Sequence, residues 1–329
     1  MPWGHLTREE RKVIGNMMEI GYARAEVARA LGRDRSTISR ELRRNANSDG
    51  RFLPDVAHVY AQCRKAVRVR RPKTGDASLM GYVAERLERF WSPEQIAGRL
   101  RRVDRPGNAD AWISHQTIYN WVRSDPARRA RFRPFLRQGR KRRRTPYGSG
   151  PSRGQIKDRV MIDKRPPAVT ERRRIGDWEG DTVEGRNHKG YVATWVERKS
   201  LYLVARKMGD KRAETLNQAT RQGFQSISRK KILTLTVDNG KEFARFQEIE
   251  RTLGAKVYFA FPYRSWERPI NENTNGLLRQ FIPKTMDLRT VGADSLARSV
   301  RSLNNRPRKT LGYRTPCEVL RLPRVALTI

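Results

Sequence analysis

The chain is poor in cysteine, with only Cys63 and Cys317 among its 329 residues. Two thiols so far apart in the sequence are too few for a disulfide framework or for a zinc site built on paired cysteines. A reducing compartment suits such a chain, because disulfides persist only in oxidising surroundings. The sequence therefore excludes a disulfide-stabilised scaffold and a cysteine-based zinc domain.

Long apolar runs are also missing. No segment approaches the ~20 apolar residues that a bilayer-spanning helix needs. The N-terminus lacks the apolar stretch of a secretory signal peptide. We therefore expect a soluble, cytoplasmic protein with no membrane partner.

Acidic residues are scarce relative to basic ones. The sequence has 34 Asp and Glu against 71 Lys and Arg, a formal net charge of +37. The excess is divided almost evenly between the two halves of the chain, so it is not a charged tail. Charge of this size favours polyanion binding and says nothing about the fold. Charge alone also fits a ribosomal or chromatin-like protein, so the sequence motifs must decide between such a protein and an enzyme that acts on nucleic acid.

The first fifty residues predict three helices. Thr7 and Glu10 have the spacing of a capping box, a second helix ends near Gly32, and a third begins after Asp34 or Ser36. Helix, glycine turn, helix is the helix-turn-helix arrangement, whose second helix enters the major groove of DNA. A plain helical hairpin with a solvated charged face is the alternative. The side chains expected to contact DNA are Arg35, Thr37, Ser39, Arg40 and Arg43.

The same pattern recurs further along the chain. Ser92 precedes Pro93, a helix cap followed by proline at the first helical position, and Ser114 caps another short helix. We expect a second helix-turn-helix here. A helical spacer that packs on the first module is the alternative. The side chains expected to contact DNA are His115, Gln116, Asn120 and Arg123.

A boundary follows the second helical region. Residues 137–144 are rich in arginine, and residues 145–151 contain turn residues that cannot propagate a helix. We expect a linker that follows DNA through Arg140, Lys141, Arg142 and Arg143. The expected domains are a helix-turn-helix domain at 1–50, a second helical DNA-binding domain at 51–136, the basic linker at 137–173, a catalytic core at 174–305 and a C-terminal tail at 306–329.

From residue 174 the hydrophobic pattern changes to that of strands. Strands come first and then alternate with helices, which predicts a mixed sheet flanked by helices. The expected fold class is multidomain, with all-α helix-turn-helix modules followed by an α/β core. The expected strands are 190–196, 201–207, 232–237 and 256–261, and the expected helices are 212–223, 242–253, 271–281 and 293–303.

Three carboxylates lie at positions suited to a metal site. Asp181 falls in the first expected strand, Asp238 just after a central strand, and Glu272 in the first turn of a helix. Hard cations such as Mg²⁺ prefer carboxylate oxygens, and a pair of such ions supports phosphoryl transfer. Asp177 and Glu179 share a strand face with Asp181 and are competing candidates. We prefer Asp181 because β-prone residues continue the strand beyond it.

Other side chains near these carboxylates have the chemistry to contact nucleic acid. Trp178, Tyr263 and Trp266 could stack on an unpaired base or pack in the core. The residues expected to contact phosphate are Lys241, Arg268 and Arg279. Arg279 follows Glu272 by two helical turns, so it shares the same helix face.

These segments together resemble the D-D-E transposases of the insertion-sequence-thirty family. The resemblance rests on the segments at 174–183, on Asp-Asn-Gly-Lys-Glu-Phe at 238–243, and on Asn-Glu-Asn-Thr-Asn-Gly-Leu-Leu-Arg-Gln at 271–280. Residues 36–42 and 304–316 extend it over essentially the whole chain. It implies an RNase H-like, integrase-type core in which Asp181, Asp238 and Glu272 hold the metal and perform catalysis.

The resemblance also implies a function. We expect a transposase that binds the terminal inverted repeats of an insertion sequence and carries out metal-dependent DNA cleavage and strand transfer. Two Mg²⁺ ions per active site are expected, with Mn²⁺ able to substitute. The expected partners are double-stranded DNA, as inverted repeats and as target, and further copies of the chain in a homodimer or larger assembly. The expected location is the bacterial cytoplasm, on the nucleoid when DNA is bound.

One segment departs from the family pattern. Residues 268–270 read Arg-Pro-Ile where Arg-Gly-Thr is usual. Proline removes a backbone donor and fixes φ where glycine is permissive. A catalytically decayed DNA-binding regulator is therefore the alternative function, and a simple nuclease is a second. A retroviral integrase is excluded, because His58 and Cys63 lack the partners of its zinc module.

Overall fold

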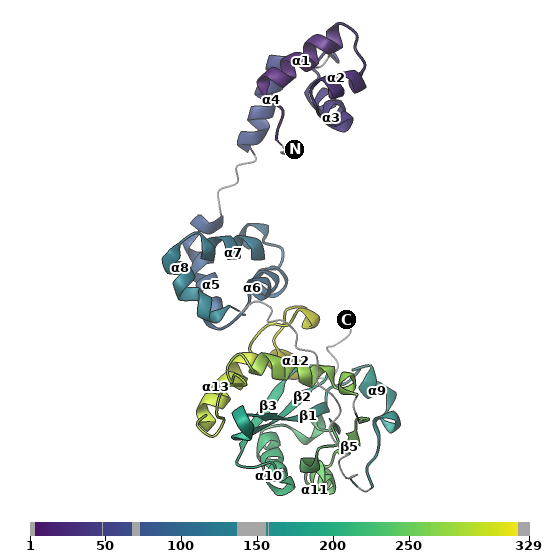
Figure 1. Cartoon of the computed structure of the whole chain (residues 1–329), viewed down its shortest axis with the longest axis vertical. Helices are drawn as coiled ribbons and strands as arrows, with labels where there is room; N and C mark the ends of the chain where they lie inside the picture. The colour runs from purple at the N-terminus through teal and green to yellow at the C-terminus, as the bar shows by residue number, and fades with distance from the viewer. Residues whose placement is uncertain are drawn as a thin grey trace. The chain divides into compact units, whose positions relative to one another are not determined.

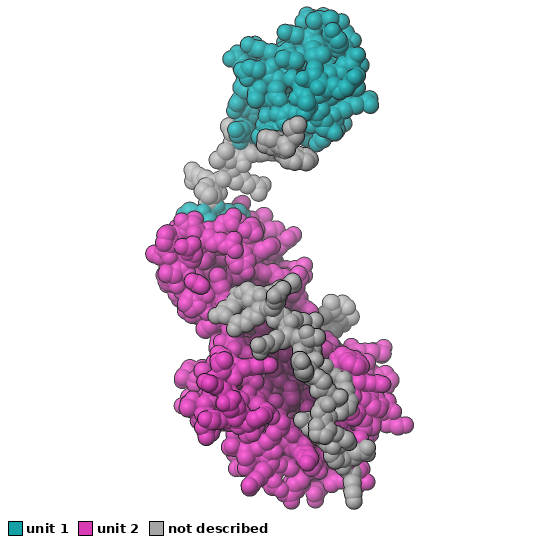
Figure 2. Space-filling view, viewed as in Figure 1, with its two compact units in different colours: residues 1–75 teal, residues 76–329 magenta. Residues whose placement is uncertain are grey.

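The computed structural model describes residues 4–47, 49–67, 73–136, 156, 158–262 and 264–321. They form two compact units, residues 1–75 and 76–329, coloured separately in Figure 2. The expected DNA contacts Arg140, Lys141, Arg142 and Arg143 lie outside the described residues, as does Tyr263. Among the helices that are described, none has the length and apolar content to cross a membrane.

The first unit contains four helices, α1 (Arg8–Glu19), α2 (Arg24–Ala30), α3 (Arg35–Asn45) and α4 (Pro54–Val67). Thr7 and Glu10 form the expected capping box, and Asp34 caps α3 by accepting from the Ser36 backbone N–H at 2.7 Å. Ile14, Val27 and Ile38 are fully buried where the first three helices meet. The predicted helix, turn, helix pair is therefore α2 and α3.

This unit extends beyond the predicted boundary at residue 50. Helix α4 packs on α1 and α3. Gly15 makes the contact with α1 possible, because a Cβ there would lie 2.4 Å from the Pro54 ring. The sequence did not predict that Gly15 contacts Pro54. The compact unit ends at Gly75.

The second unit begins with a helical module over residues 76–136. Its helices are α5 (Ala77–Glu88), α6 (Pro93–Arg99), α7 (His115–Arg123) and α8 (Pro126–Phe132), with a π-helical turn at 100–104. Ser92 and Gln95 form a capping box on α6, and Ser114 caps α7. Helices α6 and α7 pack together over Ile96, Leu100 and Ile118. The pair of capped helices predicted here is present.

The rest of the second unit is built on a five-stranded mixed sheet (Figure 1). Its strands are β1 (Asp177–Glu184), β2 (Tyr191–Glu197), β3 (Leu203–Met208), β4 (Thr234–Val237) and β5 (Lys256–Phe259). Their order is β3-β2-β1-β4-β5. The first three strands are antiparallel, and β1, β4 and β5 are parallel. The mixed sheet predicted from the alternation of strands and helices is confirmed.

Helices cover both faces of this sheet. Helices α10 (Ala213–Phe224) and α11 (Phe246–Leu253) enclose one core with Trp178 and Trp195. Helices α12 (Pro269–Leu278) and α13 (Ala293–Asn304) enclose the other with Val183 and Val196. Helix α11 starts four residues later than predicted, because residues 241–243 form a 3₁₀ turn after Gly240. Short elements, α9 (Pro167–Thr170) and α14 (Pro316–Arg321), complete the unit.

The predicted C-terminal tail packs on helix α6. The Arg99 guanidinium forms a double ion pair with Glu318, at 2.7 and 2.8 Å. A Cβ at Gly98 would lie 2.1 Å from the Tyr313 ring, so only glycine allows this approach. These contacts lie within the compact unit that contains both the helical module and the sheet.

Candidate active site

Asp181, in the middle of β1, lies next to Asp238, which directly follows the carboxyl end of the neighbouring strand β4. Strands β1 and β4 are parallel and pair Glu179 with Thr236. Two residues further along each strand are the two aspartates. The crevice at the carboxyl ends of parallel strands is where open α/β sheets bind ligands.

Arg268 lies between the two aspartates. Its Nη1 is 3.7 Å from Asp181 Oδ1 and its Nη2 is 3.4 Å from Asp238 Oδ2. Nη1 also donates a 3.0 Å hydrogen bond to the Gly180 carbonyl, which fixes the guanidinium beside strand β1. The Arg268 side chain is only 13% exposed. A cation held between two carboxylates marks this place as one that attracts positive charge.

The environment of Asp181 disfavours its ionised form. Burial raises the pKa of Asp181 to about 6, the nearby Arg268 guanidinium opposes the shift, and the negative charge of Asp238 adds to it. The Arg268 guanidinium does not fully offset the cost of burying the charged Asp181 carboxylate beside Asp238, so a second cation would stabilise the ionised form. The pair therefore fits a hard divalent cation, for which carboxylate oxygens are the preferred ligands.

Helix α12 is attached to strand β1 through two asparagines one helical turn apart. The Asn271 backbone N–H donates to Glu179 Oε2 at 3.0 Å, and Asn271 Nδ2 donates to the Glu179 carbonyl at 3.1 Å. Asn275 Nδ2 donates to Asp181 Oδ2 at 2.9 Å. Asn275 Oδ1 is buried without a protein partner among the described residues. The helix that carries Glu272 is thus positioned directly against the aspartate strand.

Glu272 lies in the first turn of α12, next to Asn271, and its side chain is exposed. Within the part of the chain that the structure describes, no three His, Cys, Asp or Glu side chains gather closely enough to hold a metal ion. The structure therefore brings Asp181 and Asp238 together around Arg268 and leaves Glu272 at the rim of the same site. The assignment of Glu272 stays a prediction.

The two competing carboxylates have structural partners. Asp177 is buried, paired with Arg174 at 3.1 Å and bonded to the Thr234 hydroxyl at 2.8 Å. Glu179 is fully buried, paired with Arg198 and bonded to Asn271. Both share the α12 face of β1 with Asp181, as strand alternation predicts. Their partners leave neither open to a ligand.

A further carboxylate near Asp181 had no predicted role. Glu242 is buried, accepts a 2.8 Å hydrogen bond from the Thr182 hydroxyl and lies 3.2 Å from Lys211 Nζ. Its charge adds to the rise in the pKa of Asp181. A Cβ at Gly240 would lie 2.4 Å from this carboxylate, so a larger residue there would displace the end of the Glu242 side chain. In the sequence, only the position of Glu242 four residues after Asp238 indicated that its carboxylate could lie near the site.

Pro269 occupies the first position of α12. The backbone N–H at that position has no partner within a helix, and the fixed φ of proline suits it. Glu272 still donates its backbone N–H to the Arg268 carbonyl at 3.3 Å. The departure from the family pattern is therefore compatible with a regular helix start before Glu272.

The predicted DNA contacts differ in their exposure. Lys241 is exposed, whereas Arg279 donates to the Glu184 carbonyl at 2.8 Å and supports the end of β1. Trp178 is a core residue and Trp266 is 68% exposed. On α3 the side chains of Arg35, Arg40 and Arg43 are exposed and those of Thr37 and Ser39 are half-buried. On α7 all four predicted contacts are exposed, namely His115, Gln116, Asn120 and Arg123.

Comparison with known proteins assigns the two parts of the chain to families. Residues 171–265 match the integrase core domain, and residues 3–45 match a helix-turn-helix domain. An integrase-type core implies use of a divalent metal. The chain is also similar to a solved catalytic core domain of BIV integrase, with 21% identity over 44% of this chain and 92% of that chain and a TM-score of 0.36.

Two relatives match along nearly the whole chain. The transposase for insertion sequence element IS4351 of Bacteroides fragilis is 38% identical over 95% of this chain and 94% of the relative. The transposase InsI for insertion sequence element IS30C of Escherichia coli K12 is 37% identical over 96% of this chain and 83% of the relative. Identity of this extent, over an RNase H-like core and a helix-turn-helix, shows that the chain belongs to the insertion-sequence-thirty family of transposases.

Proposed function

We propose that this transposase binds the terminal inverted repeats of its insertion sequence and cleaves and joins DNA at a site made of Asp181, Asp238 and Glu272. The observation that carries the proposal is the Arg268 guanidinium between the two aspartates, 3.7 and 3.4 Å away. It identifies the point on the sheet edge where two carboxylates converge and positive charge is bound. Glu272, exposed in the first turn of α12, would complete the site when metal and DNA bind.

The metal assignment follows from the donor set. Asp181 and Asp238 would hold Mg²⁺ between them, with Glu272 completing the ligands and Mn²⁺ accepted in its place. Two such ions would supply activation of the attacking oxygen and stabilisation of the leaving oxygen. The chain's own contribution is to hold Asp181 within strand β1 and Asp238 directly after strand β4. Asn275 and the Thr182 backbone N–H hold the Asp181 carboxylate, each through a 2.9 Å hydrogen bond.

The cationic side chains around the site would position the DNA strand. Arg268 lies beside the aspartates, where it would contact the scissile phosphate. Lys241, three residues after Asp238, is exposed and would contact a neighbouring phosphate. Positioning and charge stabilisation account for most of the catalysis in phosphoryl transfer. Helices α3 and α7 would bind the inverted repeats, with their exposed arginines on bases and phosphates. Two element ends require at least two copies of the chain, assembled on DNA.

A strand-transfer assay tests this function. Purified full-length protein, Mg²⁺, a labelled duplex carrying the inverted repeat and a plasmid target should give a joined product. Glu272→Gln should abolish that product, whereas Asp294→Asn should not, because Asp294 is an exposed carboxylate on α13 with no role in the site. Binding without nicking or joining would support the decayed regulator. Nicking of any duplex without joining would support the nuclease.

A further inference from the structure

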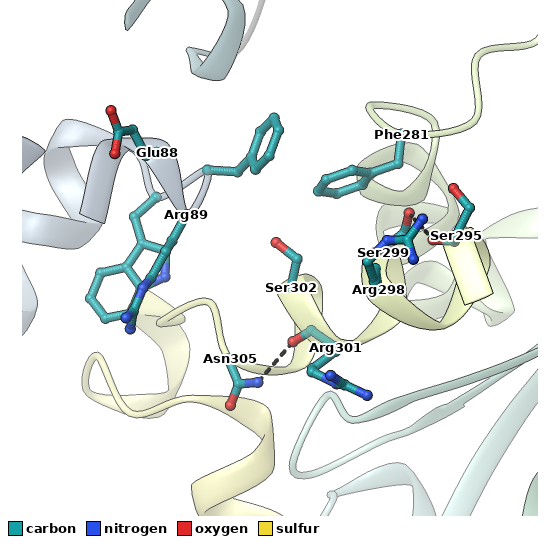
Figure 3. A pocket seen from close by; sticks show the side chains of 11 residues that line it. Glu88, Arg89, Phe281, Ser295, Arg298, Ser299, Arg301, Ser302 and Asn305 are labelled. Atoms are coloured by element: carbon teal, nitrogen blue, oxygen red, sulfur yellow. Dashed lines mark hydrogen bonds between the residues drawn. The ribbon is translucent and has the colours of Figure 1, made fainter. Parts of the chain in front are cut away.

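A pocket of about 550 Å³ lies between the helical module and helix α13 of the second unit. Figure 3 shows Glu88 and Arg89 on one wall, and Phe281, Ser295 and Arg298 on the other. Of the predicted DNA contacts that the structure describes, none lines it. The residues that line it are Glu88, Arg89, Phe90, Trp91, Phe281, Ser295, Arg298, Ser299, Arg301, Ser302 and Asn305.

Specific contacts hold the two walls together. Phe90 has a positive φ of 63°, an unusual conformation for a bulky residue. Its ring packs edge-on against Phe135 of its own module, with ring centroids 5.1 Å apart, and against Phe281 on the opposite wall, with ring centroids 4.9 Å apart. The ion pair of Arg99 with Glu318 and the contact of Gly98 with Tyr313 add to this attachment. Both walls of the pocket are therefore held in place by contacts within this unit.

The charge of the pocket is positive and largely uncompensated. Arg298 and Arg301 are exposed one turn apart on α13. No carboxylate among the described residues lies within ion-pair distance of either. Arg89 pairs only with Glu85, in an exposed contact of little energetic value. The one acidic side chain of the lining, Glu88, is paired with Arg131 at 2.7 Å. Like charges placed this way repel each other until an anion binds.

The remaining lining residues suit the DNA backbone. Ser295 and Ser302 bring hydroxyl groups to the arginine side of the pocket, and hydroxyls donate readily to phosphate oxygens. The Ser299 hydroxyl already donates to the Ser295 carbonyl at 2.9 Å. Phe281 offers an apolar surface beside them, which matches the sugar between two phosphates. A compact anion would leave the phenyl surface unused. A strand of alternating phosphate and sugar uses both kinds of surface.

We propose that this pocket binds the sugar-phosphate backbone of the substrate DNA, with Arg89, Arg298 and Arg301 on consecutive phosphates. The proposal rests on the proposed function in that the same DNA connects the repeat-binding helix α7 with the active site. The site adds contacts that carry no base specificity and set the path of the strand.

The experiment compares two triple variants of the full-length protein. The pocket variant is Arg89→Gln with Arg298→Gln and Arg301→Gln. The control variant is Arg221→Gln with Arg229→Gln and Arg251→Gln, three exposed arginines beside the helices α10 and α11 on the opposite face of the sheet. Both variants lose the same charge. Circular dichroism and thermal unfolding verify that each remains folded.

Binding to a duplex that carries the inverted repeat and its flanks is measured in EDTA at several salt concentrations. Each lost phosphate contact lowers the slope of log K against log salt by about 0.9. The pocket variant should lose roughly two to three units of slope and about 10- to 100-fold in affinity, whereas the control should stay close to wild type. Equal slopes for the two variants would overturn the proposal.

Hydroxyl-radical footprinting adds a test that net charge cannot imitate. Wild type and the control variant should protect a stretch of sugars outside the segments read by the helix-turn-helix modules, and the pocket variant should leave it open. Identical footprints would contradict the proposal even if wild type joins DNA. Because binding is measured without metal, a failure of the strand-transfer assay would leave this result unaffected.

Discussion

The side-chain amide of Asn275 donates a 2.9 Å hydrogen bond to the carboxylate of Asp181. This bond joins the helix that carries Glu272 to the strand that carries the first aspartate. Asn271, one turn earlier, attaches the same helix to Glu179 two residues before Asp181. Two asparagines therefore hold helix α12, which carries Glu272, against the strand that carries Asp181.

The three asparagines of α12 should separate stability from activity. Asn271→Ala removes two buried side-chain hydrogen bonds, to the Glu179 carbonyl and from the Thr194 hydroxyl. It should lower the free energy of unfolding by roughly 1–3 kcal/mol. Asn275→Ala should leave stability almost unchanged but lower single-turnover cleavage by about 10- to 100-fold, because Asp181 loses its support. Asn273→Ala is the control, since that side chain is exposed. Equal cleavage by the Asn273 and Asn275 variants would contradict this role.

Arg268 should compete with the divalent metal. A guanidinium this close to two carboxylates stabilises them by up to roughly 4 kcal/mol at an effective dielectric constant of 20. We expect Arg268→Ala to bind Mn²⁺ at least about tenfold more tightly than wild type without DNA, and to unfold at a lower temperature in EDTA. Titration calorimetry measures the affinity, with Arg221→Ala as the control. Weaker Mn²⁺ binding by the Arg268 variant would show that the guanidinium supports the metal site.

The raised pKa of Asp181 predicts a pH-dependent stability. Its folded-state pKa of about 6 exceeds the ordinary 3.8, so the folded state binds the proton more strongly. The contribution of Asp181 to the free energy of unfolding should therefore fall as pH rises from about 4 to about 6, and then level. In EDTA, Asp181→Asn should stabilise the protein at pH 7.5 by on the order of 1 kcal/mol and have little effect at pH 4. Urea unfolding at the two pH values measures both effects. A variant less stable than wild type at pH 7.5 would contradict the assignment.

The close approach of Gly98 to Tyr313 predicts a strong effect of one methyl group. Gly98→Ala places a Cβ within 2.1–2.5 Å of three ring atoms, so the C-terminal segment must shift. We expect a loss of roughly 1–3 kcal/mol in the free energy of unfolding of the second unit. Gly81→Ala on α5 is the control, because no atom lies within 4 Å of its Cβ position. That substitution should be neutral or stabilising by up to about 1 kcal/mol. Similar unfolding curves for both variants would contradict the packing of α6 on Tyr313.

Local signals in the sequence predicted most of the fold. Thr7, Asp34, Ser92 and Ser114 cap the helices they were expected to cap, because capping depends on residues three positions apart. The mixed sheet also followed from the change of hydrophobic period. Contacts between distant segments were not predictable in this way. The packing of α4 on Gly15 and of Tyr313 on Gly98 depends on pairs of residues that no local pattern connects.

In the candidate site, too, local features were predictable from the sequence and contacts between distant residues were not. The acidic residues Asp181 and Asp238 could be chosen from strand positions and motif spacing. The position of Arg268 could not, because a basic residue before a helix looks equally like a DNA contact. The structural roles of Asp177 and Glu179 were likewise hidden, since their partners Arg174 and Arg198 are visible only in three dimensions.

Single-turnover cleavage by Asp238→Asn tests the central assignment most directly. The substrate is a duplex that carries the inverted repeat, with Mg²⁺ present and the protein in excess. We predict that the cleavage rate falls by at least about 10³-fold, equivalent to roughly 4 kcal/mol of transition-state stabilisation, while affinity for the duplex stays close to that of wild type. A folded, DNA-binding Asp238→Asn protein that cleaves at the wild-type rate would contradict the account.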